Sequence, residues 1–473
     1  MNQEIFITEI RENAEPLTFS EGIETLKTRL DESIEFYGDN GFLKRGNVHR
    51  FEVEVDDISP IHWLKAQKFK KRFYWRDRRN ELIFAGVGLA ECKTCEEPTS
   101  TFHSFDFNGE STDSTKNLFY IGTGRFNSES ELSENWESFG RWNYYLPLFE
   151  LRKEKGKTIL ACNVVGQGEK YYEKIQKARI EIDRLKSDVA KLSVQLPTFN
   201  GTNLNPSFEQ WQSSVEKLLE FISHHEFEKA VLARTLSKSA DCKLDAVDLT
   251  INLDESNTHT YHFCIQLDDH LAFIGASPEQ LFRRNHRHVR SEALAGTCPR
   301  GKTKQEDDAF ADELLKSGKE CFEQEIVTQR ITEKLSKLCR DLQFDKDRSI
   351  RRLGKVQHLQ TGIKGELFPG VTDSDILKTL HPTPAVCGYP TDKSLERIRQ
   401  YEEFDRGLYA GIVGCFGKDI TEVSVGLRSA LVNGSILTLY AGSGIVNGSN
   451  PLAEWQETEF KMQSFSNILD LSS

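Results

Sequence analysis

The stretch ILTLYAGSGIVNGSNPLAEWQETEFK, residues 436–461, predicts a strand, a glycine turn and a helix in immediate succession. Its apolar beginning, residues 436–440, is typical of a buried strand, and the Ala-Gly-Ser-Gly at 441–444 lets the backbone approach a ligand. Residues 449–451 supply a helix start, with a capping side chain and a proline whose missing N–H costs nothing at that position. The predicted helix therefore begins beside a glycine-lined strand end.

Three charged side chains share one face of that predicted helix. Glu454, Glu457 and Lys461 lie three and four residues apart, so all three point the same way. Two acids aligned beside a glycine-lined floor suit a hard divalent cation, which prefers oxygen ligands. A solvated acidic face is the commoner explanation of such spacing, so a second group of ligands is needed to favour a metal site.

A second acidic pair lies upstream on another predicted helix. Residues 306–339 lack proline and repeat apolar side chains at helical spacing, and Glu320 and Glu323 form an i,i+3 pair within them. Two such pairs on two helices can enclose one Mg²⁺, with two carboxylates binding directly and two through water. No Cys and His at zinc spacing accompany these acids, so the sequence favours magnesium.

The composition argues against several classes of protein. The chain has 473 residues and a formal net charge of −12, which argues against a nucleic-acid-binding surface but not against a small anionic substrate. It has no apolar run long enough for a membrane span, and its N-terminus lacks a signal-peptide pattern. Ten mostly scattered cysteines are typical of reduced thiols, so a cytoplasmic protein is expected. Cys92 and Cys95 form a C-x-x-C pair, but no second pair follows, and we interpret it as incidental.

The signals along the chain divide it into two unequal parts. Residues 1–168 mix short predicted strands and loops, and residues 198–206 have the character of a linker. Ser207 and Gln210 then form a capping box ahead of an amphipathic helix. From there on the signals are dense, so residues 206–473 are predicted to hold the active region.

Two ionisable residues of the second part lie at the predicted ends of elements. Lys229 opens the apolar stretch 229–234, where loss of hydration lowers the pKa of an amine toward catalytic use, although by itself this position fits an ordinary snorkelling lysine better. Ser277 and Pro278 predict a helix cap and first helical position, which places Glu279 in the first turn. Pairing with the helix dipole explains an acid there. Neither residue is specific alone.

The order of these segments resembles that of the chorismate-utilising enzymes, which include isochorismate, salicylate, anthranilate and aminodeoxychorismate synthases. The resemblance is dense over about residues 207–465 and thin before them. It is carried by Lys229–Arg234, Ser277–Glu279, Leu294–Thr297, Lys319–Glu323, Val356–Leu359, Leu380–Pro384, Arg406–Gly411, Arg428, Ala441–Val446 and Glu454–Lys461. So many motifs in one order leave little room for chance.

The resemblance implies roles for the matching positions. Glu323 and Glu457 would bind Mg²⁺ directly, and the ion would hold one chorismate carboxylate. Glu320 and Glu454 would lie in its water shell. The remaining substrate-binding positions would be Thr297, His358 near the ring, Tyr409, Arg428, Gly442, Gly444 and Lys461. An arginine suits this role because its planar guanidinium pairs bidentately with a carboxylate.

The resemblance also implies the reaction. A nucleophile enters the ring at C2 while the C4 hydroxyl leaves, so water needs a base and the hydroxyl needs an acid. Water-using members carry a lysine where ammonia-using members typically carry a glutamine, and Lys229 occupies that position. Glu279 matches the general acid. The hypothesis requires Lys229 to be partly neutral and Glu279 to be partly protonated near neutral pH.

Isochorismate synthase, an isomerase, is therefore the expected activity. Ala295 argues against aminodeoxychorismate synthase, which tends to carry a nucleophilic lysine in that motif. Salicylate synthase shares the lysine at position 229 and stays open, as does a chorismate-binding subunit without turnover. The N-terminal part favours the menaquinone type over the shorter siderophore type. No obligate glutaminase subunit, nucleic acid or membrane partner is expected, and the protein would be a monomer or homodimer.

For the fold, the resemblance implies one α+β unit like that of anthranilate and aminodeoxychorismate synthases. Large antiparallel sheets would be flanked by helices, with the active-site cleft between them. Residues 1–205 would form an N-terminal variable part of this unit and residues 206–473 its chorismate-binding catalytic region. The sequence pattern alone, with hairpins such as 261–275, favours antiparallel pairing over a βαβ chain.

Overall fold

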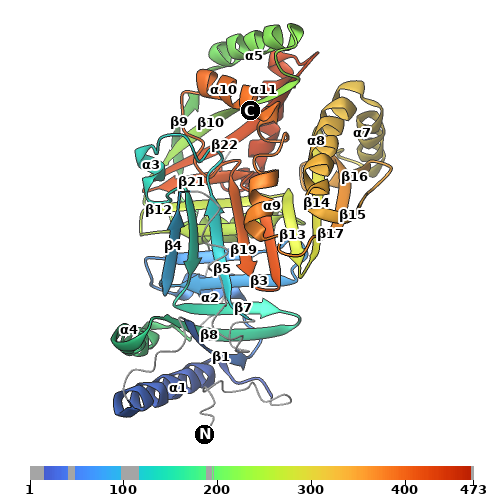
Figure 1. Ribbon diagram of the computed structural model, residues 1–473. Helices are drawn as coiled ribbons and strands as arrows, with labels where there is room; N and C mark the ends of the chain where they lie inside the picture. The colour runs from blue at the N-terminus through green and yellow to red at the C-terminus, as the bar shows by residue number, and fades with distance from the viewer. Residues whose placement is uncertain (1–14, 41–47, 97–116, 188–193, 195, 470–473) are drawn as a thin grey trace.

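Two large antiparallel β-sheets, with helices on their outer sides, make up the protein (Figure 1). The computed structural model describes residues 15–40, 48–96, 117–187, 194 and 196–469. Each strand pair within the two sheets is antiparallel. The predicted α+β class with large antiparallel sheets is confirmed.

The first sheet has 12 strands within the described residues and contains strands from both parts of the chain. In spatial order it runs β1 (Val48–Val55), β8 (Lys157–Val165), β7 (Phe149–Glu154), β3 (Leu82–Val87), β2 (Arg72–Arg76), β11 (Tyr261–Gln266), β12 (Leu271–Ser277), β21 (Ser429–Asn433), β22 (Ile436–Val446), β10 (Lys229–Ala240) and β18 (Gly388–Tyr389), and β9 (Phe199–Asn205) also pairs with β10. The predicted hairpin 261–275 corresponds to β11 and β12.

The second sheet, of 10 strands in the same described ranges, is likewise shared between the two parts. Its order is β15 (Cys339–Phe344), β17 (Val356–Leu367), β14 (His288–Pro299), β13 (Gln280–Asn285), β20 (Ile420–Val425), β19 (Ile412–Gly417), β5 (Phe119–Gly124), β6 (Trp142–Leu146) and β4 (Glu91–Cys95), with β16 (Ser349–Arg352) beside β17. Cys92 and Cys95 thus lie on the edge strand β4 and are not joined in a disulfide.

The helices lie at the two ends of the molecule and along its sides (Figure 1). They are α1 (Phe19–Asn40), α2 (Pro60–Ala66), α3 (Glu134–Glu137), α4 (Gly168–Glu181), α5 (Phe208–Ser223), α6 (Ala246–Ser256), α7 (Lys304–Lys316), α8 (Gly318–Ser336), α9 (Asp373–Leu380), α10 (Thr391–Tyr401) and α11 (Pro451–Met462). Short 3₁₀ turns follow at Ile182–Arg184 and Gln463–Phe465. Of the helices described, none is long and apolar enough to cross a membrane.

Aromatic side chains fill the main core, which contains residues of both sheets. Phe263 and Phe273 stack with ring centroids 5.4 Å apart, and Trp136 meets the edge of Phe273 at 5.6 Å. Tyr144 and Phe416 pack edge to face in the second sheet. Each of these rings buries a large apolar surface, so this core holds the two sheets together.

Two smaller cores attach the helices to the first sheet. One lies under α1, α2, α4 and α6, and the other packs α5 and α11 onto β10 and β22. In the latter, the Trp211 indole donates a hydrogen bond to the Pro451 carbonyl at 3.1 Å, which joins α5 to the start of α11. The predicted capping box of Ser207 and Gln210 begins α5, and Asn450 caps α11 as the sequence indicates.

Three sequence predictions about local structure are wrong. Residues 198–206 are not a linker, because β9 forms there and pairs with β10. Residues 306–339 are not one helix: Ser317 ends α7, and its side chain caps α8 by accepting from the Glu320 N–H. No helix begins at Ser277, the last residue of β12, because strand pairing in both sheets draws the chain into β13 three residues later, at Gln280.

The substitution of a phenylalanine in the main core tests how much the aromatic side chains there contribute to the stability of the protein. Phe263→Ala is expected to lower the free energy of unfolding by about 3–5 kcal/mol, because it removes a fully buried ring and leaves a cavity. Ile180→Ala, at a side chain that is 70% exposed, should change it by less than about 0.5 kcal/mol. Chemical denaturation of both variants measures the difference, and equal effects would contradict this assignment of the core.

Candidate active site

One cavity lies where β10, β22, β14 and β17 meet α8 and α11, and it gathers residues from far apart in the chain. Ten of the predicted site residues line it: Glu279, Thr297, Glu323, His358, Tyr409, Arg428, Gly442, Gly444, Glu457 and Lys461. The other three, Lys229, Glu320 and Glu454, lie directly behind this lining. Lys229 contacts Glu323, Glu320 accepts from the Thr297 N–H, and Glu454 shares the Ser443 hydroxyl with Glu457. The structure thus brings the whole predicted set together.

Helix α11 presents its acids toward β22 through one hydroxyl. Ser443 Oγ lies 2.5 Å from Glu454 Oε2 and 2.6 Å from Glu457 Oε2. Burial opposes ionisation of Glu457, but Lys461, at 2.8 Å, keeps its pKa below the ordinary value. The pKa of Glu454 is raised instead, by burial and by the neighbouring Glu457. The single hydroxyl proton can go to only one acid at a time, so this pair favours one charged and one protonated carboxyl.

Helix α11 is also held in place by a residue of β10. Arg234 of β10 donates to Thr458 Oγ1 at 2.6 Å, and its guanidinium lies 3.7 Å from the centre of the Trp455 ring. Thr458 and Trp455 flank Glu457 in the sequence. The contacts of Arg234 therefore fix the rotation of α11 that aims its acids at the cavity.

Lys319 joins the two acidic helices. Its ammonium lies 2.6 Å from Glu454 Oε1 on α11 and 3.4 Å from Glu320 Oε1 on its own helix, α8. Glu320 also accepts a hydrogen bond from the Thr297 N–H at 3.0 Å. Burial and then the nearby Glu323 raise the pKa of Glu320 to about 7. The lysine thus separates two carboxyls that would otherwise repel each other.

Lys229, the first residue of β10, is fully buried and contacts one of the predicted metal ligands. Its Nζ donates to Glu323 Oε1 at 2.7 Å. The contact passes over Gly444 of β22, where an added Cβ would lie 2.4 Å from Glu323 Oε1 and 2.9 Å from Lys229 Cε. Glycine at 444 is therefore required for lysine and glutamate to meet.

Glu279 lies in the short connection between β12 and β13, on the cavity wall. Burial raises the pKa of its carboxyl to about 8, and the charge of Glu292 adds to this shift. Lys229 and Lys461 oppose it. A carboxyl with this pKa is protonated at neutral pH and can donate its proton to a leaving group.

A neutral histidine and an arginine form another wall. His358 Nδ1 lies 3.2 Å from the Gly296 carbonyl oxygen, to which it donates, so its Nε2 is free to accept from Arg428 Nη2 at 2.9 Å. Burial, and next Arg428, lower the pKa of His358 to about 3. Arg428 has a φ of 46°, a left-handed conformation that is uncommon for a long side chain and often marks a functional position.

The floor and far wall come from β22 and the segment before β19. Lys461 Nζ donates to the Gly442 carbonyl at 2.9 Å, and the Tyr409 ring stacks on Tyr440 with centroids 5.4 Å apart. Burial raises the pKa of Tyr409 to about 12, so its hydroxyl is a hydrogen-bond donor at neutral pH. Donors from Tyr409, Arg428 and Lys461 thus surround the same space.

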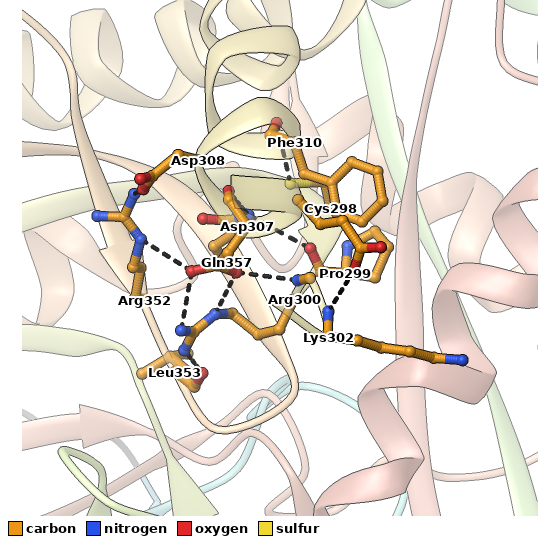
Figure 2. A network of polar contacts seen from close by, with 12 residues as sticks. Cys298, Pro299, Arg300, Lys302, Asp307, Asp308, Phe310, Arg352, Leu353 and Gln357 are labelled. Atoms are coloured by element: carbon orange, nitrogen blue, oxygen red, sulfur yellow. Dashed lines mark hydrogen bonds and ion pairs between the residues drawn. The ribbon is translucent and has the colours of Figure 1, made fainter. Parts of the chain in front are cut away.

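Ion pairs hold the loop between β14 and α7 in place (Figure 2). Arg300 donates to both oxygens of Asp307 at 2.6 and 2.9 Å, and Arg352 of β16 donates to Asp307 at 3.2 Å. The start of α7 is thereby fixed against the strands that carry Thr297 and His358. Because α7 leads directly into α8, the same network limits where the acids of α8 can lie.

For several site residues the sequence predicts no individual role, although some of them lie within the motifs that carry the resemblance. Ser443 lies inside the Ala-Gly-Ser-Gly turn and Lys319 beside Glu320, but neither was assigned a contact. The apolar walls are also new: they comprise Val231, Leu294, Ala385, Val386, Leu427 and Tyr440. Apart from the hydroxyl of Tyr440, their side chains have no ionisable group, so only the fold reveals that they face the cavity.

Of the four predicted metal ligands, Glu323 and Glu457 line the cavity and Glu320 and Glu454 lie behind it, and all four contact lysines. Charge coupling joins Glu320 to Glu323 and Glu457, and Glu454 to Glu457. Over the described ranges of the chain, no three acidic, histidine or cysteine side chains form a ready metal cluster. The donor chemistry still fits a hard cation, because these are carboxylate oxygens, buried in Glu454 and partly buried in the other three, whose repulsion a cation would relieve.

Comparison with known proteins agrees with this geometry. The sequence profile of the family described as "Chorismate binding enzyme" matches residues 40–470. Isochorismate synthase 2, chloroplastic, of Arabidopsis thaliana is 36% identical over 90% of this chain and 81% of its own length. Isochorismate synthase MenF of Pasteurella multocida is 30% identical over 87% of this chain and 90% of its own.

A solved structure extends the likeness to three dimensions. The menaquinone-specific isochorismate synthase MenF from Escherichia coli superimposes with a TM-score of 0.83 and 26% identity, covering 95% of this chain and 99% of that one. The family profile spans both sheets and all the residues of the cavity. The chain therefore belongs to the chorismate-binding enzyme family and is an enzyme.

Proposed function

We propose that this enzyme is an isochorismate synthase, which converts chorismate to isochorismate. Water enters the ring at C2, the ring double bond shifts, and the C4 hydroxyl leaves as water, so the overall change is an isomerisation. One observation carries the proposal: buried Glu279, with a pKa near 8, lines the cavity in which arginine and lysine can hold carboxylates, and buried Lys229 contacts Glu323 of that lining from behind.

Lys229 has the position of the base and Glu279 that of the acid. Lys229 would take a proton from the attacking water, and Glu279 would give its proton to the departing C4 hydroxyl. In the described arrangement Lys229 donates to Glu323, so the base role requires its release from that carboxylate. The raised pKa of Glu279 supports the complementary role, because the group holds its proton at neutral pH.

The acids of α8 and α11 support the proposal of a magnesium site. Glu323 and Glu457 would bind Mg²⁺ directly, and Glu320 and Glu454 would act through water. When bound, the ion would supply positive charge for one substrate carboxylate. The cavity otherwise places acids where an anionic substrate must enter, so charge compensation is required.

The remaining contacts would hold and orient the ring. Arg428 can pair with the second carboxylate, and Tyr409 and Lys461 can donate to substrate oxygens. Neutral His358, with its Nε2 toward Arg428, would lie near the ring. The backbone at Thr297, Gly442 and Gly444 would complete the contacts that the sequence predicts.

The proposal extends to the setting of the enzyme. A menaquinone-type role is supported by the near-complete overlap with the Escherichia coli protein, whose name states that specificity. We also propose a cytoplasmic monomer or homodimer that needs no glutaminase subunit, because its nucleophile is water rather than ammonia.

Product analysis tests the activity and its metal. With chorismate and Mg²⁺ the purified protein is expected to form isochorismate, detected by chromatography, and EDTA should stop the reaction until Mg²⁺ is added back. Salicylate with pyruvate would identify a salicylate synthase instead, and binding without any product would identify a non-catalytic subunit. An aminated product in the presence of ammonium would reject water as the nucleophile.

The base is tested by Lys229→Ala. Turnover is expected to fall by about 10²–10⁴-fold, the usual contribution of a positioned general base, while chorismate still binds. Lys238→Ala, on the same strand but away from the cavity, serves as the control and should retain activity. Loss of chorismate binding in Lys229→Ala, measured by calorimetry, would show that the lysine holds substrate instead.

The acid is tested by the pH dependence of kcat. Since Glu279 must be protonated to act, the rate is expected to fall as the pH rises through about 8, where the carboxyl loses its proton. Glu279→Gln should lower kcat by about 10²–10⁴-fold and remove that alkaline limb. If the alkaline fall in kcat is unchanged in the variant, the titration of another group causes it.

A further inference from the structure

An ion pair behind the cavity wall joins the N-terminal part of the chain to the second sheet. Arg78, in the turn between β2 and β3, donates to Glu292 of β14 with Nη1–Oε1 at 2.6 Å and Nη2–Oε2 at 2.8 Å. The side chain of Glu292 is 3% exposed and that of Arg78 13%. A bidentate arginine–carboxylate pair with this burial has a fixed geometry. Removing one partner is energetically costly, because the other charge is left buried and unpaired.

The same pair contacts the backbone on both sides of Glu279. Arg78 Nη1 donates to the Pro278 carbonyl at 3.3 Å, and Glu292 Oε1 accepts from the Gln280 N–H at 3.0 Å. Gln360 of β17 donates to the other oxygen of Glu292 at 2.5 Å. One arginine and one glutamate therefore hold the peptide groups that precede and follow the residue at the cavity wall.

We propose that Arg78 and Glu292 are positioning residues that hold the general acid Glu279 against the substrate. The inference rests on the proposed function, in which that carboxyl protonates the leaving hydroxyl. Glu279 lies in a two-residue connection, where no ladder of strand hydrogen bonds sets its direction. Its own backbone contacts are the carbonyl, which accepts from the Val425 N–H, and the N–H, which donates to Ser277 Oγ. The ion pair adds the flanking contacts that fix it.

The pair also sets the charge that Glu279 experiences. Around Glu279 stand Glu292 on β14, Lys229 on β10 and Lys461 on α11, and of these only the glutamate favours the protonated form. Around Glu292 itself stand Arg78 and, on β16 and β11, Arg351 and Tyr261. Removing the charge of Glu292 therefore leaves Glu279 facing two lysines and lowers its pKa.

Three variants of the full-length enzyme separate these effects. Arg78→Met is expected to lower kcat by about 10–100-fold with little change in the KM for chorismate, because it displaces the acid and not the carboxylate contacts. Arg78→Lys should recover part of the rate, since lysine reaches Glu292 without the fork. Glu292→Gln should lower kcat and move the alkaline limb of the kcat profile to lower pH.

A second buried arginine–glutamate pair provides the matched control. Arg50 and Glu150 form a bidentate contact at 2.8 and 2.9 Å in the first sheet, with side chains 2% and 0% exposed, and do not line the cavity. Arg50→Met should lower the unfolding midpoint as much as Arg78→Met does, yet leave kcat and its pH profile unchanged. Thermal unfolding followed by circular dichroism checks that each variant is folded.

The outcomes distinguish the inference from the function on which it rests. If Glu279→Gln is inactive but folded Arg78 and Glu292 variants keep the wild-type kcat and alkaline limb, the positioning role is wrong and the proposed function stands. If Glu279→Gln is fully active, the general-acid role of Glu279 is wrong, and the positioning role fails with it. A rise in KM alone in the Arg78 variants would also overturn the inference, because it would indicate a substrate contact.

Discussion

Charge balance among buried groups is the constraint on which this cavity depends. Each of the four acids of α8 and α11 is matched by a lysine: Lys319 beside Glu320 and Glu454, Lys229 beside Glu323, and Lys461 beside Glu457. In a medium of low effective dielectric constant, an unmatched charge here would cost several kcal/mol. A substrate with two carboxylates adds negative charge to this set of paired groups. The proposed chemistry therefore needs a bound cation, and it needs Lys229 to be released from Glu323.

The sequence predicted which residues come together at the site better than it predicted the contacts that these residues make. Glu454, Glu457 and Lys461 were placed on one face because helical periodicity alone dictates it. Ser443 could not be assigned, since its contact with both acids depends on how α11 crosses β22. The helix expected at Pro278 fails for a related reason: cap and proline signals are local, and strand pairing between distant segments overrode them.

The fold was predictable in class but not in the way the two parts of the chain combine. Alternating patterns and hairpins indicated antiparallel sheets. They could not indicate that β2 pairs with β11 or β5 with β19, so that each sheet crosses the proposed boundary at residue 205. Arg78 illustrates the result, because a residue from a stretch with few motifs reaches the backbone around Glu279. Long-range pairing of this kind leaves no mark in a single sequence.

The strand that carries Lys229 has a consequence for biosynthesis. Its long partner is β22, which comes much later in the chain and therefore leaves the ribosome well after β10. Until then, β10 can pair with β9 but exposes its other edge, and such an edge invites association with neighbouring chains. Synthesis of β22 therefore covers this edge, and nascent chains stalled before β22 would be exposed to aggregation and to chaperones.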